Sequence, residues 1–292
     1  MFSPETPTAQ RRRVVGVLLV AIVAVSSSAV ILKSIEGVDS TVLAFWRTTM
    51  VAALLLPAVR SLSASDARRI FLAGACLAGH FAVWFASLNH TTVMRSTVLV
   101  ALSPLWAALL EWLFLQVRPT RRYWTGMAVC APGIALLTLA GNDAGQAGWY
   151  GDMLAALGGM LGAAYLVLGR SVRERVGIGT YACLVCAAAS VVLLPTAVAM
   201  SAPLWGWDTQ TWLLIGALAA GPQLFGHNGF NYALRWLPAA TVSAAMLMEP
   251  VGATALALMV LGEIPGPMGA AGALFVVGGV LYGTWDAQTP AG

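Results

Sequence analysis

Ten long apolar stretches, each nearly free of charge, divide the chain from end to end. A helix needs about 20 mostly apolar residues to cross the hydrocarbon core of a bilayer. Only 10% of the 292 residues are charged and 59% are hydrophobic, whereas soluble domains carry about 25% charged residues. The sequence therefore predicts an all-α membrane protein with ten transmembrane helices, at about residues 14–33, 41–60, 69–89, 94–116, 121–140, 149–169, 178–200, 209–233, 238–261 and 267–285. The loops leave no room for a soluble domain, so any site has to lie within the membrane or at its edge.

Positive charges gather in the loops on one side of the predicted membrane. Cytoplasmic loops of membrane proteins keep an excess of Lys and Arg. With the N-terminus inside, thirteen of the sixteen basic residues are cytoplasmic: Arg11, Arg12, Arg13, Arg60, Arg68, Arg69, Arg118, Arg121, Arg122, Arg170, Arg173, Arg175 and Arg235. We expect a multi-pass protein of the bacterial inner (plasma) membrane with both termini cytoplasmic. The net charge of +4 forms no soluble basic patch, so the lipid bilayer, and not nucleic acid, is the expected partner.

The fourth and fifth stretches reappear as the ninth and tenth at an offset of 146 residues. The offset matches Pro104 with Pro250, Pro119 with Pro265, Gly126 with Gly272 and Gly133 with Gly279. Five stretches, an odd number, precede the second unit, so the two units enter the membrane in opposite orientations. This predicts an inverted five-plus-five repeat, with helices 1 to 5 in residues 1–145 and helices 6 to 10 in residues 146–292. Such halves can open a shared cavity to either side, which is the basis of alternating access.

The segments around the two prolines resemble a known family. SPLWAALLEWLFL and EPVGATALALMVLGE, each followed by a glycine-rich helix, are similar to the paired signature of the drug/metabolite transporter superfamily, EamA type. Arg47, in FWRTTMVAALLL, also resembles the family's pattern. Within the superfamily the chain is most similar to the bacterial aromatic amino-acid exporters. The resemblance implies a secondary transporter that exports amino acids, aromatic ones favoured, or similar small metabolites. One departure is that Gln116 and Val117 stand where the second half has Glu263, which argues against a symmetric role for a carboxylate there.

Three ionisable side chains, Arg47, Glu111 and Glu249, lie inside predicted spans. A charge at mid-bilayer costs about 3 kcal/mol on insertion scales, so such groups face a cavity or form pairs. Glu249 precedes Pro250, whose ring frees a backbone carbonyl, and this suits a cavity wall that binds a cation or an ammonium group. A structural carboxylate or a salt bridge to Arg47 is the alternative. Arg47 is about two turns from the external end, and Glu111 is near the cytoplasmic end, so we expect anchoring or structural roles for both.

The third stretch places His80, Trp84 and Ser87 on one helix face, at i, i+4 and i+7. Such a polar stripe faces protein or water and not lipid. An unperturbed histidine titrates near physiological pH, so His80 is a candidate proton carrier or carboxylate partner. A hydrogen bond between helices explains it equally well.

The eighth stretch carries polar side chains at i, i+4 and i+8, namely Gln223, His227 and Asn231, with Asn228 beside them and Gly221-Pro222 just before. Polar groups this dense are costly against lipid. We expect them to line the transport pathway or, alternatively, to form hydrogen bonds between helices. Three further residues complete a candidate aromatic cavity: Ser103, Trp106 and Tyr165.

Transport is favoured over the rival functions. The sequence has no GxxxxGK[ST] phosphate loop, so coupling to an ion gradient, with protons as the candidate ion, or to the substrate's own gradient is expected, and no cofactor is. A carrier of sugar phosphates would need several cations in the cavity, and an intramembrane enzyme would need a metal pair or an activated nucleophile. Cys183 and Cys186 form a CxxC motif inside an apolar stretch without basic partners, so no metal is expected either.

Overall fold

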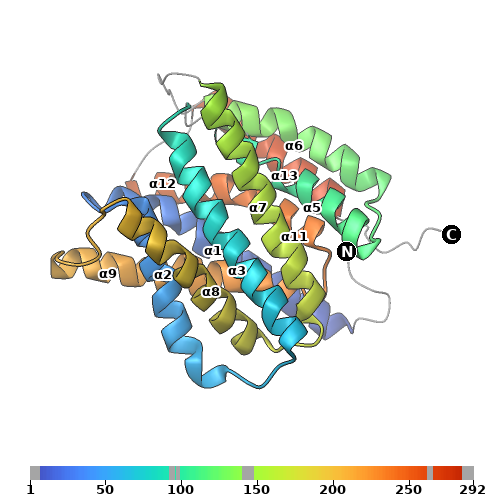
Figure 1. The fold of residues 1–292 in the computed structure, drawn as a ribbon. Coiled ribbons are helices and arrows are strands. Elements are labelled where there is room, and N and C mark those ends of the chain that lie inside the picture. The colour runs from blue at the N-terminus through green and yellow to red at the C-terminus, as the bar shows by residue number, and fades with distance from the viewer. Residues whose placement is uncertain (1–6, 92–95, 97–98, 140–147, 262–265, 285–292) are drawn as a thin grey trace.

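The computed structural model describes residues 7–91, 96, 99–139, 148–261 and 266–284, and every regular element in these ranges is a helix (Figure 1). Glu263 and Pro265, which belong to the predicted repeat, lie outside the described residues. Each of the ten predicted stretches contains helix. The elements are α1 (Thr8–Lys33), α2 (Ser40–Leu55), a 3-10 turn η1 (Leu56–Ala58), α3 (Ala64–Leu88), α5 (Ser103–Leu110), a π-helix η2 (Glu111–Leu115), α6 (Arg121–Leu139), α7 (Trp149–Arg173), α8 (Ile178–Ala199), α9 (Thr209–Leu218), a π-helix η3 (Ala219–His227), α10 (Asn228–Ala233), α11 (Ala239–Met246), α12 (Met248–Leu261) and α13 (Pro267–Thr284).

Among the described residues, six helices are long and apolar enough to cross a membrane: Thr8–Leu32, Ser40–Ala58, Ala64–Ser87, Trp149–Arg173, Ile178–Ala199 and Pro267–Thr284. Shorter apolar helices cover Ser103–Leu115 and Ala239–Ala253. Several predicted spans are thus divided into shorter elements and are not single straight helices. The protein is a multi-pass membrane protein.

Side-chain caps begin four of the helices in the described ranges, α2, α3, α6 and α9, and at α6 the Oγ1 of Thr120 accepts from the backbone N–H of Tyr123. Asp39 accepts a hydrogen bond from the backbone N–H of Thr41 at the start of α2, and Ser63 accepts one from Asp66 at the start of α3. Asp208 caps α9 by accepting from the N–H of Thr211, and this bond lowers the pKa of the Asp208 carboxyl. Each cap satisfies one of the free N–H groups of a first helical turn.

Prolines interrupt the fourth and the ninth spans at equivalent places. A proline has no N–H to donate to the carbonyl four residues earlier, and its ring collides with that carbonyl. The ninth span breaks between α11 and α12 at Leu247, three residues before Pro250, and the fourth has a turn at 101–102, just before Pro104. The Oγ of Ser103 donates to the freed carbonyl of Val100 at 2.6 Å.

The most extensive helix pairings join the first five spans to the last five. The pairs are α6 with α13, α3 with α7 and with α8, α2 with α8 and with η3, α1 with η3 and with α12, and α5 with α7 and with α11. In Figure 1, α3 and α7 run side by side. The set of pairings is symmetric. If each span is replaced by the span five places away in the sequence, every pairing becomes itself or another pairing of the same set. The two halves of the sequence are therefore interleaved in space and do not form separate bundles.

Four glycines bring α6 and α13 into direct backbone contact. A Cβ atom on Gly126 would lie 2.6 Å from the carbonyl oxygen of Gly279, and one on Gly133 would lie 2.8 Å from that of Gly272. Gly272 stands 146 residues after Gly126, and Gly279 stands 146 residues after Gly133, so the two contacts are equivalent in the repeat. Small residues at such crossings let membrane helices approach closely.

Candidate functional site

Arg47 of α2 is buried within the protein, with a relative exposure of 7%. Its Nε donates to Oε1 of Gln223 at 2.9 Å, and its guanidinium carbon lies 4.8 Å from the ring centre of Phe81. Its Nη2 is buried and has no hydrogen-bond partner among the described residues. Of the two roles expected for Arg47, anchoring and structural pairing, these contacts support pairing, because the side chain is buried and bonds to another helix.

Gln223 is fully buried in the π-helix η3, opposite Arg47. It accepts from Arg47 through its oxygen, and its Nε2 donates to Sγ of Cys186 on α8 at 3.5 Å. The helix has π geometry from Ala219 to His227, around the Gly-Pro pair that predicts a break. Wide π turns occur frequently at functional sites.

Three predicted side chains form a buried chain of hydrogen bonds between α7 and α10. The hydroxyl of Tyr165 donates to Oδ1 of Asn231 at 2.5 Å, and Nδ2 of Asn231 donates to Oδ1 of Asn228 at 3.1 Å. The backbone oxygen of Asn231 accepts from Nε of Arg173 at 2.9 Å. Nδ2 of Asn228 has no partner in the described part of the chain. This series of hydrogen bonds therefore ends at the Nδ2 of Asn228, a donor without a partner among the described residues.

His80 and Trp84 of α3 pack against the glycine-rich face of α7. Nδ1 of His80 lies 2.8 Å from the carbonyl oxygen of Gly158, and the rings of His80 and Trp84 stack at 5.8 Å. Ser103 joins the same face, because its Oγ, which donates to Val100, also lies 3.0 Å from the carbonyl oxygen of Gly159. His80 thus makes the interhelical hydrogen bond that the sequence leaves as an alternative to a functional role. The Nε1 atoms of Trp84 and of Trp106 are buried without a partner among the residues described.

His227 meets the Arg47 group through Phe81. The rings of Phe81 and His227 lie edge to face, 5.9 Å apart, so Phe81 contacts both the guanidinium and the imidazole. Nδ1 of His227 is buried and unpartnered within the described ranges. The sequence gives no signal for Phe81, since a phenylalanine in an apolar span looks like any packing residue.

Glu249 lies in the first turn of α12, directly after the break at Leu247. Oγ of Ser26 donates to its backbone carbonyl at 3.1 Å. The residue is half-buried, and its carboxylate has no hydrogen bond or ion pair to any described residue. The charges of Arg47 and Glu249 interact, although no ion pair within 4 Å joins them.

These contacts define a central cluster, made of Arg47, Phe81, Gln223, His227 and Glu249. The charge of Arg47 also interacts with His80 and with Tyr165. The cluster therefore draws on α2, α3, η3 and α12, and it neighbours the tyrosine chain of α7. Buried polar atoms in proteins nearly always have partners. Buried side-chain nitrogens of Arg47, His227 and Asn228 thus keep unused hydrogen-bonding capacity toward the described residues.

Glu111 is 1% exposed and ties three spans together at one end of the protein. Its two carboxylate oxygens accept from the backbone N–H groups of Ala239 and Ala240 at 2.6 and 2.9 Å, at the start of α11. Nε of Arg170, on α7, lies 3.2 Å away. Glu111 does not extend to the membrane interface, contrary to expectation, and its role is structural, as expected.

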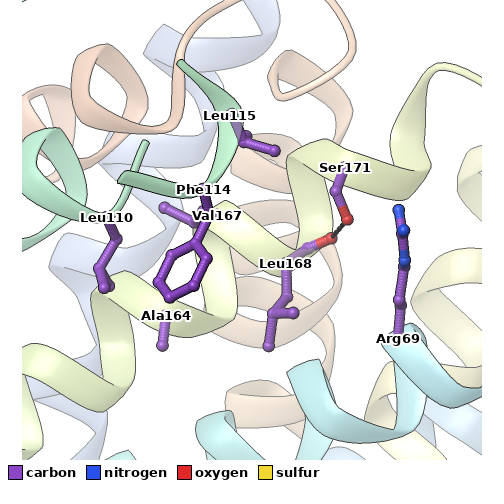
Figure 2. Close-up of a pocket in the computed structure, with 8 residues that line it drawn as sticks. All are labelled: Arg69, Leu110, Phe114, Leu115, Ala164, Val167, Leu168 and Ser171. Atoms are coloured by element: carbon purple, nitrogen blue, oxygen red, sulfur yellow. Dashed lines mark hydrogen bonds between the residues drawn. The ribbon is translucent and has the colours of Figure 1, made fainter. Parts of the chain in front are cut away.

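Two hollows lie outside the central cluster. One of about 380 Å³ is lined by α3, the α5–η2 segment and α7, and Figure 2 shows its largely apolar wall with Arg69 and Ser171 at one side. The other, of about 70 Å³, borders Pro104 and Leu247. None of the predicted site residues lines either hollow. In the described part of the chain, no group of three His, Cys, Asp or Glu residues could hold a metal ion.

A bundle of apolar helices around a buried, partly unpartnered polar cluster defines the chain as a membrane protein with a polar interior. The model of the EamA-like transporter family matches residues 12–139 and again residues 149–284. The chain belongs to the EamA-like transporter family. It is a membrane transporter and not an enzyme.

Two curated relatives are transporters by name. A protein of Streptantibioticus cattleyicolor named "Probable terminal-alkyne amino-acid exporter" is 28% identical over 197 residues, which are 66% of this chain and 64% of that protein. The match thus spans just under two thirds of the exporter's length. The "Uncharacterized transporter YwfM" of Bacillus subtilis is 24% identical over 222 residues, 73% of this chain and 71% of that protein.

A solved crystal structure has the same fold. It superposes with a TM-score of 0.80, covering 94% of this chain and 97% of that chain at 20% sequence identity. At this identity the likeness establishes the fold alone.

Proposed function

We propose that this protein is a secondary transporter that exports amino acids, aromatic ones favoured, by alternating access. The observation that carries the proposal is the central cluster, in which buried donors without partners and a free carboxylate lie beside aromatic rings. An α-amino acid needs a cation and an anion for its two charges, and an aromatic side chain needs apolar or aromatic surface. The name of the Streptantibioticus relative, an amino-acid exporter, supports the same substrate class.

The proposed substrate-binding residues are those in and around the central cluster: His80, Trp84, Ser103, Trp106, Tyr165, Gln223, His227, Asn228, Asn231 and Glu249. Glu249 or His80 carries a coupling proton in this proposal. Glu249 is the better placed of the two, since its carboxylate has no fixed partner among the described residues, whereas His80 bonds to Gly158.

Alternating access follows from an inverted repeat of residues 1–145 and 146–292, which is also part of the proposal. Three observations support it. The family model matches twice in succession, the helix pairings are exchanged when the spans are shifted by five, and the breaks before Pro104 and Pro250 stand 146 residues apart.

We propose a plasma-membrane location with both termini in the cytoplasm. Contacts support one shared basic face. The side chain of Arg175 bonds to Asp66 at 2.7 Å, which raises the pKa of Arg175, and the N–H of Arg60 bonds to Thr180 at 3.0 Å. These contacts bring two basic loops together, and positive loops are retained in the cytoplasm.

Transport by purified protein in liposomes tests the proposal. A panel of labelled amino acids is offered with and without an imposed pH gradient, and we expect exchange of phenylalanine, tryptophan or tyrosine, faster with the gradient. Transport of other metabolites while every amino acid fails would overturn the substrate class. Normal transport with an unchanged pH dependence in both Glu249→Gln and His80→Gln would overturn the proton carriers and leave the substrate class intact.

A further inference from the structure

The guanidinium of Arg47 has unused hydrogen-bonding capacity at the centre of the protein. Only its Nε is bonded to a described residue, and that partner, Gln223, is a neutral amide. An arginine carries five N–H donors. A buried charge is costly unless it is paired, and the carboxylate of Glu249 lies too far away to form an ion pair. The cluster therefore holds a cation that is incompletely neutralised.

The neighbours of Arg47 hold its guanidinium in one orientation. Gln223 is itself fixed by Cys186 and receives the Nε side of the group, while the ring of Phe81 lies against it at 4.8 Å. These contacts occupy one edge and one face and leave the Nη2 edge free. A guanidinium edge presents parallel N–H groups that match the two oxygens of a carboxylate.

The spacing of Arg47 and Glu249 also carries information. Their charges interact, but no ion pair within 4 Å joins them, so neither side chain neutralises the other by direct contact. A direct salt bridge would satisfy both side chains and leave nothing for a ligand. A zwitterion satisfies both only when it is bound.

We propose that Arg47 binds the α-carboxylate of the transported amino acid and that Glu249 binds its α-ammonium group. This inference rests on the proposed function and names the groups that recognise the substrate class. Gln223 is a positioning residue that aims the guanidinium. Compounds that lack either charge bind more weakly than the zwitterion.

Three ligands that differ by one charged group test the assignment. They are L-phenylalanine, phenethylamine, which lacks the carboxylate, and 3-phenylpropionate, which lacks the ammonium group. Their affinities are measured by calorimetry and by competition for transport, with the full chain in wild-type form and as Arg47→Gln, Arg47→Lys and Glu249→Gln. The matched control is Arg118→Gln, since Arg118 is exposed and lies outside the cluster. Thermal unfolding of each variant checks folding.

Arg47→Gln is expected to weaken the binding of phenylalanine and of phenylpropionate by about 10- to 100-fold, the range for a lost hydrogen bond to a charged group. The affinity for phenethylamine is expected to stay unchanged. Arg47→Lys is expected to lose less affinity than Arg47→Gln, because lysine keeps the positive charge but lacks the two parallel N–H groups of the guanidinium. Glu249→Gln is expected to weaken the binding of phenylalanine and phenethylamine but not of phenylpropionate. Arg118→Gln is expected to change none of the three affinities.

The outcomes separate this inference from the proposed function. If Arg47→Gln weakens phenylalanine and phenethylamine equally, the carboxylate role is wrong while amino-acid transport stands. If wild-type protein binds phenylpropionate in an Arg47-dependent way but binds and transports no amino acid, the amino-acid function is wrong and the carboxylate site stands. Failure of all three ligands overturns both. Should Arg47→Gln not fold, the phenylalanine-to-phenethylamine ratio of Arg47→Lys decides, and an unchanged ratio overturns the role.

Discussion

Single side chains in this protein have roles that depend on partners far away in the sequence. Glu111 and Arg175 show the contrast. Glu111 is buried, accepts two hydrogen bonds from α11 and forms an ion pair with Arg170 of α7, whereas Arg175 makes one ion pair, with Asp66, from a side chain that is 53% exposed. Exposed ion pairs contribute little to stability, while removing one member of a buried pair is costly.

We expect Glu111→Ala to lower the free energy of unfolding by about 3 kcal/mol, because it leaves two helix N–H groups and Arg170 without their acceptor. Glu111→Gln is expected to lose less, since an amide oxygen still accepts one bond. Arg175→Gln serves as the control and should cost less than about 1 kcal/mol. Thermal or denaturant unfolding in detergent measures all three. Equal effects for Glu111→Ala and Arg175→Gln would contradict the capping role.

The sequence predicts which polar side chains are neighbours on one helix better than it predicts their partners on other helices. Spacing places Asn228 and Asn231 near one another, and they are hydrogen-bonded. It also places His80 and Trp84 on one face that meets protein or water, and this face meets α7. A structural pairing is among the roles expected for Arg47, but its distance from a helix end says nothing about its partner Gln223, 176 residues later. Partners so distant in sequence leave no local pattern to read.

At the scale of elements, glycine decides how closely two helices approach. On α13, Gly278 and Gly279 are neighbours with opposite surroundings. A Cβ on Gly279 would lie 2.6 Å from the carbonyl oxygen of Gly126, while one on Gly278 would meet nothing within 4 Å.

This contrast predicts that Gly279→Ala lowers the unfolding temperature, because backbone atoms of α6 would have to move away. Gly278→Ala should be neutral or stabilising, by up to about 1 kcal/mol, since alanine favours helix. Unfolding monitored by circular dichroism compares the two variants. A loss for Gly278→Ala as large as that for Gly279→Ala would show that the close crossing is not what limits stability.

The sequence predicts where helices occur better than it predicts the geometry of those helices. All ten apolar stretches contain helix, and the breaks of the fourth and ninth spans fall just before prolines. The π turn of η3 surrounds Gly221-Pro222, whereas the π turn of η2 and the left-handed backbone of Gln116, with φ of 56°, have no comparable signal. They arise where packing against other spans outweighs local preference, as it does for Gln223 against Arg47.

The whole molecule is a single interleaved unit. The most extensive pairings of α1, α2, α3, α5 and α6 are all made with helices of the second half of the chain. A membrane helix bundle is stabilised by close packing between its helices, so a half that lacks these partners has little to hold it together.

We therefore expect that neither residues 1–145 nor residues 146–292 folds when expressed alone, and that the two segments co-expressed form a stable complex. Co-purification through a tag on one segment, followed by size-exclusion chromatography and the liposome transport assay, measures the outcome. A monodisperse, thermally cooperative single segment would contradict the expectation.

The exchange of helix pairings described above also constrains how such a protein can arise. A five-helix chain with these contacts could not complete its core from its own helices. With the inverted repeat proposed above, the missing partners would be supplied by a second copy that lies upside down in the same bilayer, and the simplest ancestor would then be an antiparallel pair of identical short chains, later joined end to end.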